Sequence, residues 1–119
     1  MKHLLLVGTL LCRLFADMES YKEGEHLYFQ KGCNNCHGTN AEGSSYYPPL
    51  ARKNKSYLKE KLLAFKRGKA SSQKAEVMFT FTKNLNEMQI EKLSSFLAEF
   101  QETDTQKYQI SDDILGGKN

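Results

Sequence analysis

Hydrophobic side chains recur at helical spacing along this chain, and no segment of any length alternates in the manner of a strand. The clearest stripe belongs to a helix near the C-terminus and comprises Ile90, Leu93, Phe96, Leu97 and Phe100. Asn86 is a suitable N-cap for this helix, and Gln89 three residues later completes a capping-box pattern. The hydrophobic pattern therefore predicts an all-α fold.

Two further helices are expected before this one. The first covers about 18–31, with Tyr21, Leu27 and Tyr28 as its apolar contacts. The second begins at Lys55 or Ser56 and ends near Arg67; its stripe is Leu58, Leu62 and Phe65, and Gly68 serves as its C-cap. A glycine- and serine-rich loop separates the two helices and ends at Pro48-Pro49, and an apolar cluster at 77–81 follows a polar loop.

The two ends of the chain differ from its middle. Residues 1–16 resemble a signal peptide, because Lys2 precedes the apolar run Leu4–Cys12 and Ala16 offers a small residue for cleavage. A buried N-terminal helix, a retained anchor and a lipid on Cys12 remain alternatives, although the bulky Leu11 disfavours the lipid. We expect one domain over 17–101 and a polar tail over 102–119.

Composition and charge add limits to this picture. The 119 residues suffice for a single domain, and the hydrophobic content of 39% predicts a modest core. No stretch approaches the roughly 18 apolar residues of a membrane span. The segment Arg52 to Lys74 carries nine basic residues against one acid, Glu60. This segment is either a solvated helix face or a surface that steers acidic partners; nucleic-acid binding is not expected of an exported protein.

The cysteines carry the strongest chemical signal. Signal removal would take Cys12 away and leave Cys33 and Cys36, which form a C-x-x-C-H run with His37. This run is the attachment signature of a c-type haem: the two thiols form thioethers with the vinyl groups, and the histidine becomes the proximal ligand of the iron. An exported chain with no leftover thiol fits an oxidising compartment. A dithiol redox pair and half of a zinc site are the haem-free alternatives, but the βαβ context and further ligands that they need are missing from the pattern.

A haem iron with two protein ligands needs a second one from elsewhere in the chain. The candidates are Met18, His26, Met78 and Met88. A methionine between Val77 and Phe79 is by default part of a hydrophobic core. Met78 nevertheless follows a flexible loop, so it could reach the haem, whereas the other three lie on predicted helices.

From Gly24 to Phe100 the chain resembles the small bacterial class I cytochromes c. The matching features come in the family's order: Gly24 and Tyr28, Cys33 to His37, Pro48-Pro49-Leu50, Tyr57-Leu58, Phe65 and Gly68, Met78, and the final helix through Phe96. The resemblance implies that the first and last helices cross, with Gly24 against Phe96. It also implies that the intervening helix and loops enclose one covalently bound haem c and its iron.

The resemblance assigns roles to several residues. It implies that the Pro48 carbonyl accepts a hydrogen bond from His37, that Leu50 packs on the haem, and that Met78 is the sixth ligand. Lys69 departs from the family's usual arginine, so Tyr46, Tyr47, Arg52 and Lys55 become alternative contacts for the haem propionates.

The resemblance implies that the protein is a periplasmic electron carrier and not an enzyme. It also implies that quinol-oxidising cytochrome complexes donate the electrons and that terminal oxidases or peroxidases accept them. A sensor or peroxidase-type subunit with an open sixth site is the alternative.

Overall fold

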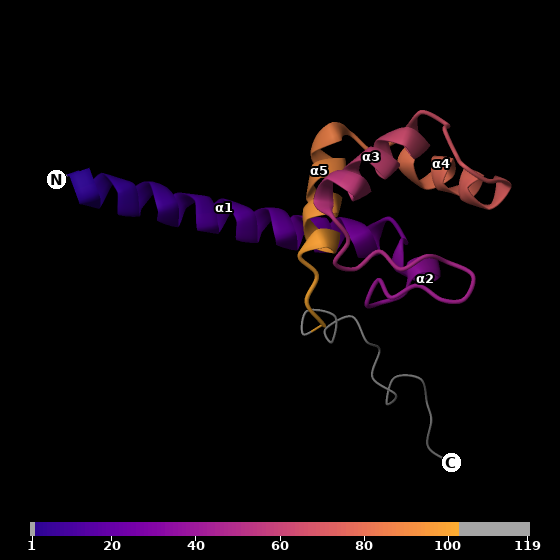
Figure 1. Cartoon of the computed structure of the whole chain (residues 1–119), viewed down its shortest axis with the longest axis horizontal. Helices are drawn as coiled ribbons and strands as arrows, with labels where there is room; N and C mark the ends of the chain where they lie inside the picture. The colour runs from indigo at the N-terminus through magenta and orange to yellow at the C-terminus, as the bar shows by residue number, and fades with distance from the viewer. Residues whose placement is uncertain (1, 103–119) are drawn as a thin grey trace, which may run out of the picture.

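Within residues 2–102, the part of the chain that the computed structural model describes, the regular structure is helical and contains no strand. The elements are α1 (Lys2–Gln30), α2 (Asn34–His37), α3 (Lys55–Lys66), the 3₁₀ helix η1 (Gln73–Glu76), α4 (Val77–Thr82) and α5 (Glu87–Ala98), as Figure 1 shows. The prediction of an all-α fold is confirmed. No helix in these residues is long and apolar enough to cross a membrane.

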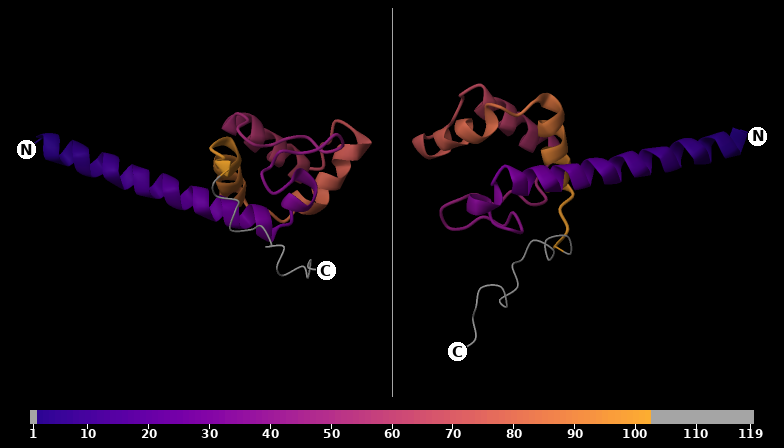
Figure 2. Two further views of the ribbon diagram at one scale, coloured as in Figure 1. Left: turned by 90° about the horizontal axis from the view of Figure 1, so that it is seen from below. Right: turned by 180° about the vertical axis from the view of Figure 1, so that it is seen from behind.

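The crossing of α1 and α5 organises the molecule, and Figures 1 and 2 show α5 lying steeply across the C-terminal half of α1. Gly24 makes this crossing close. A Cβ atom at this position would lie 2.7 Å from the Cβ of Phe96 and would overlap the carbonyl oxygen of Lys92. The predicted contact of Gly24 with Phe96 is therefore present, and the backbone of α5 also rests on this glycine.

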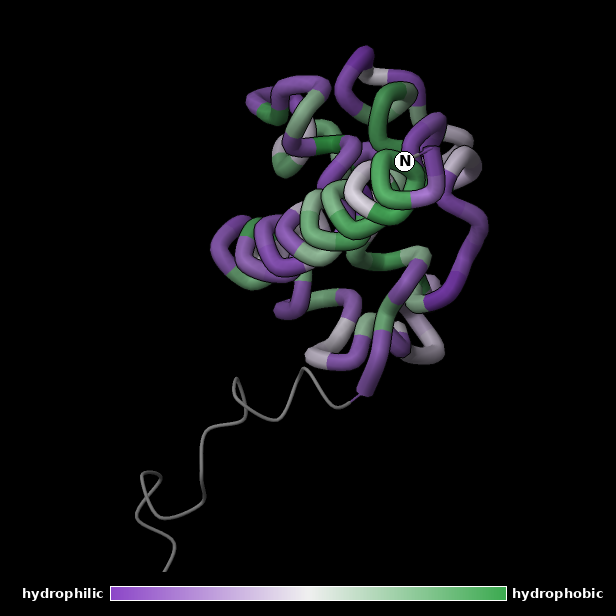
Figure 3. Tube along the Cα trace, turned by 90° about the vertical axis from the view of Figure 1, so that its left-hand side faces the viewer, coloured by the Kyte–Doolittle hydropathy of each residue, from purple (hydrophilic) through white to green (hydrophobic). Residues whose placement is uncertain are grey.

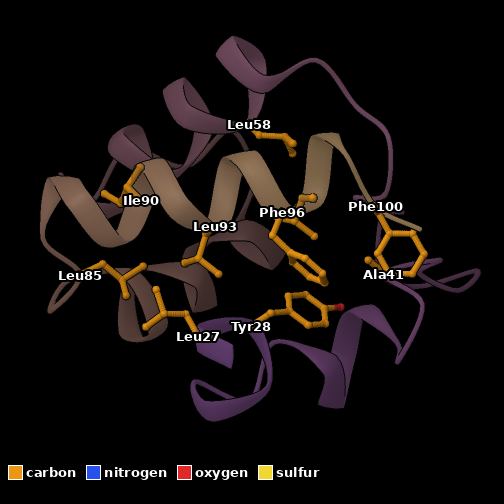
Figure 4. Close-up of a cluster of buried hydrophobic side chains, with 10 residues drawn as sticks. Leu27, Tyr28, Ala41, Leu58, Leu85, Ile90, Leu93, Phe96 and Phe100 are labelled. Carbon is orange, nitrogen blue, oxygen red and sulfur yellow. The ribbon is translucent and has the colours of Figure 1, made fainter. Parts of the chain in front are cut away.

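The hydrophobic core lies where α1, α3 and α5 meet (Figure 4). Its aromatic centre is Phe96, whose ring centroid lies 5.5 Å from that of Tyr28, 5.2 Å from that of Tyr21 and 5.8 Å from that of Phe100. Aliphatic side chains surround these rings, among them Leu27, Leu58, Leu85, Ile90, Leu93 and Leu97. The predicted stripe of the last helix is thus its buried face.

The first helix is longer than the sequence pattern indicated. We expected it to begin near residue 18, but α1 runs without interruption from Lys2. Its N-terminal half is hydrophobic (Figure 3). This half is nevertheless exposed, because its large apolar side chains from Leu4 to Phe15 are 50 to 82% accessible. No proline interrupts this segment, and leucine favours the helix strongly, so local propensity accounts for the extension. The alternative of a buried N-terminal helix is wrong for this structure.

The remaining helix boundaries agree closely with the sequence signals. The side chains of Asn86 and Gln89 exchange hydrogen bonds with each other's backbone N–H groups at 2.8 and 3.0 Å, so the predicted capping box is confirmed. Asn54 caps α3, and Gly68 follows that helix with a φ of 73°. The apolar cluster at 77–81, for which we predicted no element, forms the short helix α4 directly after η1.

Candidate functional site

One turn of helix carries the C-x-x-C-H run. Gly32, with a φ of 75°, turns the chain out of α1, and the backbone N–H of Cys33 then donates to the carbonyl of Tyr28 at 3.0 Å. The N–H of His37 donates to the carbonyl of Cys33 at 2.9 Å, which closes the turn. Residues four apart lie on the same face of a helix, so Cys33 and His37 share one side of α2.

The orientation of His37 follows from a single hydrogen bond. The residue is only 6% exposed, and its Nδ1 lies 2.9 Å from the carbonyl oxygen of Pro48. A carbonyl oxygen can only accept, so Nδ1 carries the hydrogen of this bond, and in the neutral imidazole Nε2 is then the nitrogen with the lone pair. An imidazole in this state is the form that binds a metal, and the acceptor behind it fixes the plane of the ring.

The loop after α2 brings Pro48 to this position. The N–H of Gly43 donates to the carbonyl of His37 at 2.8 Å, and the N–H of Ser44 donates to the carbonyl of Tyr47 at 2.8 Å. Gly43 has a φ of 68°, and a Cβ atom there would lie 2.5 Å from the nitrogen of Pro49. The close return of the loop therefore requires glycine at this position.

Tyr28 connects the core to the motif. Its ring is fully buried, and its hydroxyl donates to the carbonyl of Gly38, directly after His37, at 2.6 Å. Burial raises the pKa of this phenol, so it stays protonated and remains a donor. The sequence identified Tyr28 as an apolar contact and as the aromatic residue of the family pattern. A buried tyrosine usually has a polar partner, but the pattern gave no sign of where its hydroxyl points.

The two thiols of the motif have different surroundings. Burial raises the pKa of Cys33 to about 11, whereas Cys36 is exposed. A dithiol redox site depends on a thiolate with a lowered pKa, so the environment of Cys33 disfavours that alternative. Among residues 2–102, no group of three or more histidine, cysteine and acidic side chains is placed to hold a metal ion. The ligand set of the zinc alternative is therefore absent from this part of the chain.

Comparison with known proteins agrees with the geometry. The family model described as Cytochrome c matches residues 21–101. The chain belongs to the cytochrome c family. A curated relative, cytochrome c-554(547) of Halothiobacillus neapolitanus, is 31% identical over 83 residues, which are 63% of this chain and 90% of the relative. Membership implies covalently bound haem c with its iron and makes the chain a haem electron carrier that works with redox partners.

The hydrophobic surface of this cytochrome c fits such a group. Four of the six residues of α4 are apolar, yet the protein buries none of them fully: Val77, Phe79 and Phe81 are 52, 43 and 41% exposed, and Met78 is half-buried. A haem against α4 would cover apolar side chains that the polypeptide leaves accessible. The two free thiols of the motif and the Nε2 of His37 are the donors that haem c requires. The exposed apolar side chains of α4 provide a surface on which it could pack.

The other predicted haem contact and the other candidate ligands have distinct positions. Leu50 is half-buried against the core, and its N–H donates to the carbonyl of Ala41 at 2.8 Å. Met18, His26 and Met88 are exposed and line a groove between α1 and the start of α5. The lining of that groove includes no residue of the C-x-x-C-H run.

Two of the four alternative propionate contacts are engaged elsewhere. The Nε of Arg52 donates to the carbonyl of Phe100 at 3.3 Å, and the ammonium of Lys55 pairs with Glu91 at 2.5 Å. Tyr46 and Tyr47 stay close to the motif, since the ring centroid of Tyr47 lies 6.3 Å from that of His37. Of the four residues, the two tyrosines lie beside the C-x-x-C-H run, and Tyr46 also contacts Lys74.

Proposed function

We propose that this chain is a periplasmic, one-electron carrier whose haem iron is bound axially by His37 and Met78. The observation that supports the proposal is the hydrogen bond between His37 Nδ1 and Pro48, which leaves Nε2 available to bind the iron. Haem iron supplies the reversible one-electron chemistry, and histidine–methionine ligation raises its reduction potential relative to two histidines.

Met78 is proposed as the sixth ligand because of its place on α4. It is half-buried, and the hydroxyl of Thr82 donates to its carbonyl at 2.7 Å, so the first turn of this short helix is tied to its end. Met18 and Met88 are exposed on other helices and line a separate groove. A thioether on the sixth position would also keep dioxygen from the iron, as a carrier requires.

The proposed site of action is outside the cytoplasm. Residues 1–16 act as the signal peptide, residues 17–101 form the cytochrome domain and residues 102–119 form a polar tail, of which all but Glu102 lies outside the described residues. Cleavage would remove Cys12 and leave the two haem-binding thiols as the cysteines of the mature chain. Covalent attachment then uses every remaining thiol, which suits an oxidising compartment.

The proposed donors are quinol-oxidising cytochrome complexes, and the proposed acceptors are terminal oxidases or peroxidases. The basic segment Arg52 to Lys74 would guide this chain to their acidic surfaces. Glu91 partly neutralises this segment, because it pairs with Lys55 and Lys59. The exposed side chains of Arg67 and Lys69 are therefore better placed to act on a partner.

Carbon monoxide separates the carrier from the alternative with an open sixth site. The ferrous protein should resist carbon monoxide and keep its spectrum, because Met78 must leave before the gas can bind. The Met78→Ala variant should bind it at once. An immediate large shift in the wild type would contradict the carrier proposal and favour a sensor or peroxidase-type subunit.

A further inference from the structure

A contact between a lysine and an aromatic ring joins two distant segments beside the site. The ammonium nitrogen of Lys74 lies 3.5 Å from the ring centroid of Tyr46. Lys74 belongs to η1, which leads directly into α4, whereas Tyr46 belongs to the loop that follows α2. A cation centred this close to an aromatic face is attracted by the ring quadrupole.

Tyr46 lies in a turn beside the C-x-x-C-H run, and hydrogen bonds and a ring contact hold this turn. The rings of Tyr46 and Tyr47 meet edge to face at 4.8 Å between centroids. Their backbone N–H groups both donate to the hydroxyl oxygen of Ser44 at 3.1 Å. The ring of Tyr47 lies next to His37, at 6.3 Å between centroids.

Lys74 lies on a short helical segment with a defined N-cap. Ser72 caps η1 by accepting a hydrogen bond from the N–H of Ala75 at 3.2 Å, and η1 continues into α4 without a break. Lys74 is therefore four residues before Met78 on one continuous run of helix. The most extensive packing of α4 on another α-helix is with α3, which does not carry the C-x-x-C-H run.

We propose that Lys74 and Tyr46 form a clasp that holds the segment bearing Met78 against the loop that follows α2, the helix bearing Cys36 and His37. The clasp rests on the proposed ligation by Met78, and its two members are positioning residues that do not themselves bind iron. The clasp restrains η1 and therefore α4, which follows it directly. It would thus slow the dissociation of Met78 from the iron.

The experiment measures how fast imidazole displaces the sixth ligand from the ferric holoprotein. Lys74→Gln and Tyr46→Leu should each speed displacement about two- to five-fold, the range expected for an exposed cation–π contact. The double variant should be no faster than the faster single variant, since both substitutions remove the same contact.

A matched variant makes this test specific. Lys69→Gln removes the same charge from the preceding loop and should react at close to the wild-type rate. Unchanged rates in Lys74→Gln and Tyr46→Leu, additive effects in the double variant, or an equal effect of Lys69→Gln would overturn the clasp.

Hydrogen exchange separates failure of the clasp from failure of the proposed ligation. The backbone amides of 73–78 should exchange faster in Lys74→Gln than in Lys69→Gln, whichever residue binds the iron. Equal exchange in the two variants would overturn the clasp even if Met78 is the ligand. If the sixth ligand of Met78→Ala is the same as that of the wild type, Met78 does not bind the iron. Faster exchange in Lys74→Gln would then still support the clasp as a contact between the two segments.

Discussion

At the scale of single residues, the hydrogen bond from His37 to Pro48 joins the C-x-x-C-H run to the backbone of the loop that follows it. The carbonyl of Pro48 fixes both the tautomer and the plane of the imidazole. Gly43 makes that position of Pro48 sterically accessible, because a side chain there would collide with the returning proline segment. The carbonyl of Pro48 and the absence of a side chain at Gly43 thus both determine how His37 is oriented.

Tyr28→Phe tests the tie between the core and the motif. The change deletes the hydroxyl donor to the carbonyl of Gly38, which keeps only its hydrogen bond from the N–H of Ala41. We expect the free energy of unfolding to fall by about 0.5–1.5 kcal/mol, measured by guanidinium denaturation of the holoprotein. Tyr57→Phe, at an exposed tyrosine, should change it by far less. Equal losses in the two variants would show that the hydrogen bond to Gly38 contributes little.

The residue-scale features differ in how visible they are in the sequence. The hydrogen bond between His37 and Pro48 could be predicted, because both residues belong to an ordered series of motifs. The hydroxyl of Tyr28 and the contact of Lys74 with Tyr46 could not, because each depends on where a side chain points after the loops have folded. Periodicity reports which face is buried and carries no information on such directions.

At the scale of elements, the packing of α1 against α5 where they cross stabilises the fold. Gly24→Ala tests this crossing. Alanine favours a helix over glycine by about 1 kcal/mol, but overpacking a fixed backbone costs about 1–3 kcal/mol or more. Because the new methyl group would meet the carbonyl of Lys92 and the Cβ of Phe96, we expect a net loss of stability. Thermal unfolding of the variant measures it, and an unchanged or higher melting temperature would contradict a close crossing.

The ion pairs between α3 and α5 give the fold a pH dependence at acidic pH. The neighbouring Lys55 and Lys59 lower the pKa of Glu91 below its usual value, so the charged form stabilises the folded state. This contribution is present above the ordinary pKa of a glutamate and is lost as the pH falls through the lowered one.

Glu91→Gln should therefore reduce stability at neutral pH by about 0.2–1 kcal/mol, since the pairs are partly exposed. Denaturation of both proteins across the acidic range measures the difference, which should disappear as the pH falls through the lowered pKa of Glu91. Glu99→Gln, at an exposed glutamate on the C-terminal end of α5, is the control. A difference that persists at low pH would contradict a role for the charge.

Element boundaries were predictable where a cap or a glycine marks them. Asn86, Gln89 and Gly68 marked the start of α5 and the end of α3 correctly. The start of α1 carries no such mark, because the apolar residues of 1–16 continue the helix with no break in local propensity. The helix α4 was not predicted because it is short and apolar on most sides, so it lacks a helical period.

At the scale of the whole molecule, charge is distributed unevenly around a net value of +3. Lys69→Glu should slow electron transfer with an acidic redox partner several-fold at low ionic strength, because it reverses a charge in the exposed basic segment. Stopped-flow rates over a range of salt concentrations measure the effect, which should shrink as screening increases. Lys22→Glu makes the same change on α1, away from that segment; an equal slowing there would indicate a general charge effect and no docking surface.

The central claim, a haem iron held between His37 and Met78, is tested most directly by redox-titrated absorbance at the methionine–iron charge-transfer band. The ferric wild type should show this band, and the band should disappear on reduction with a single midpoint. Met78→Ala should lose the band, and Met88→Ala should retain it. A band that survives in Met78→Ala, or that is lost only in Met88→Ala, would contradict the account.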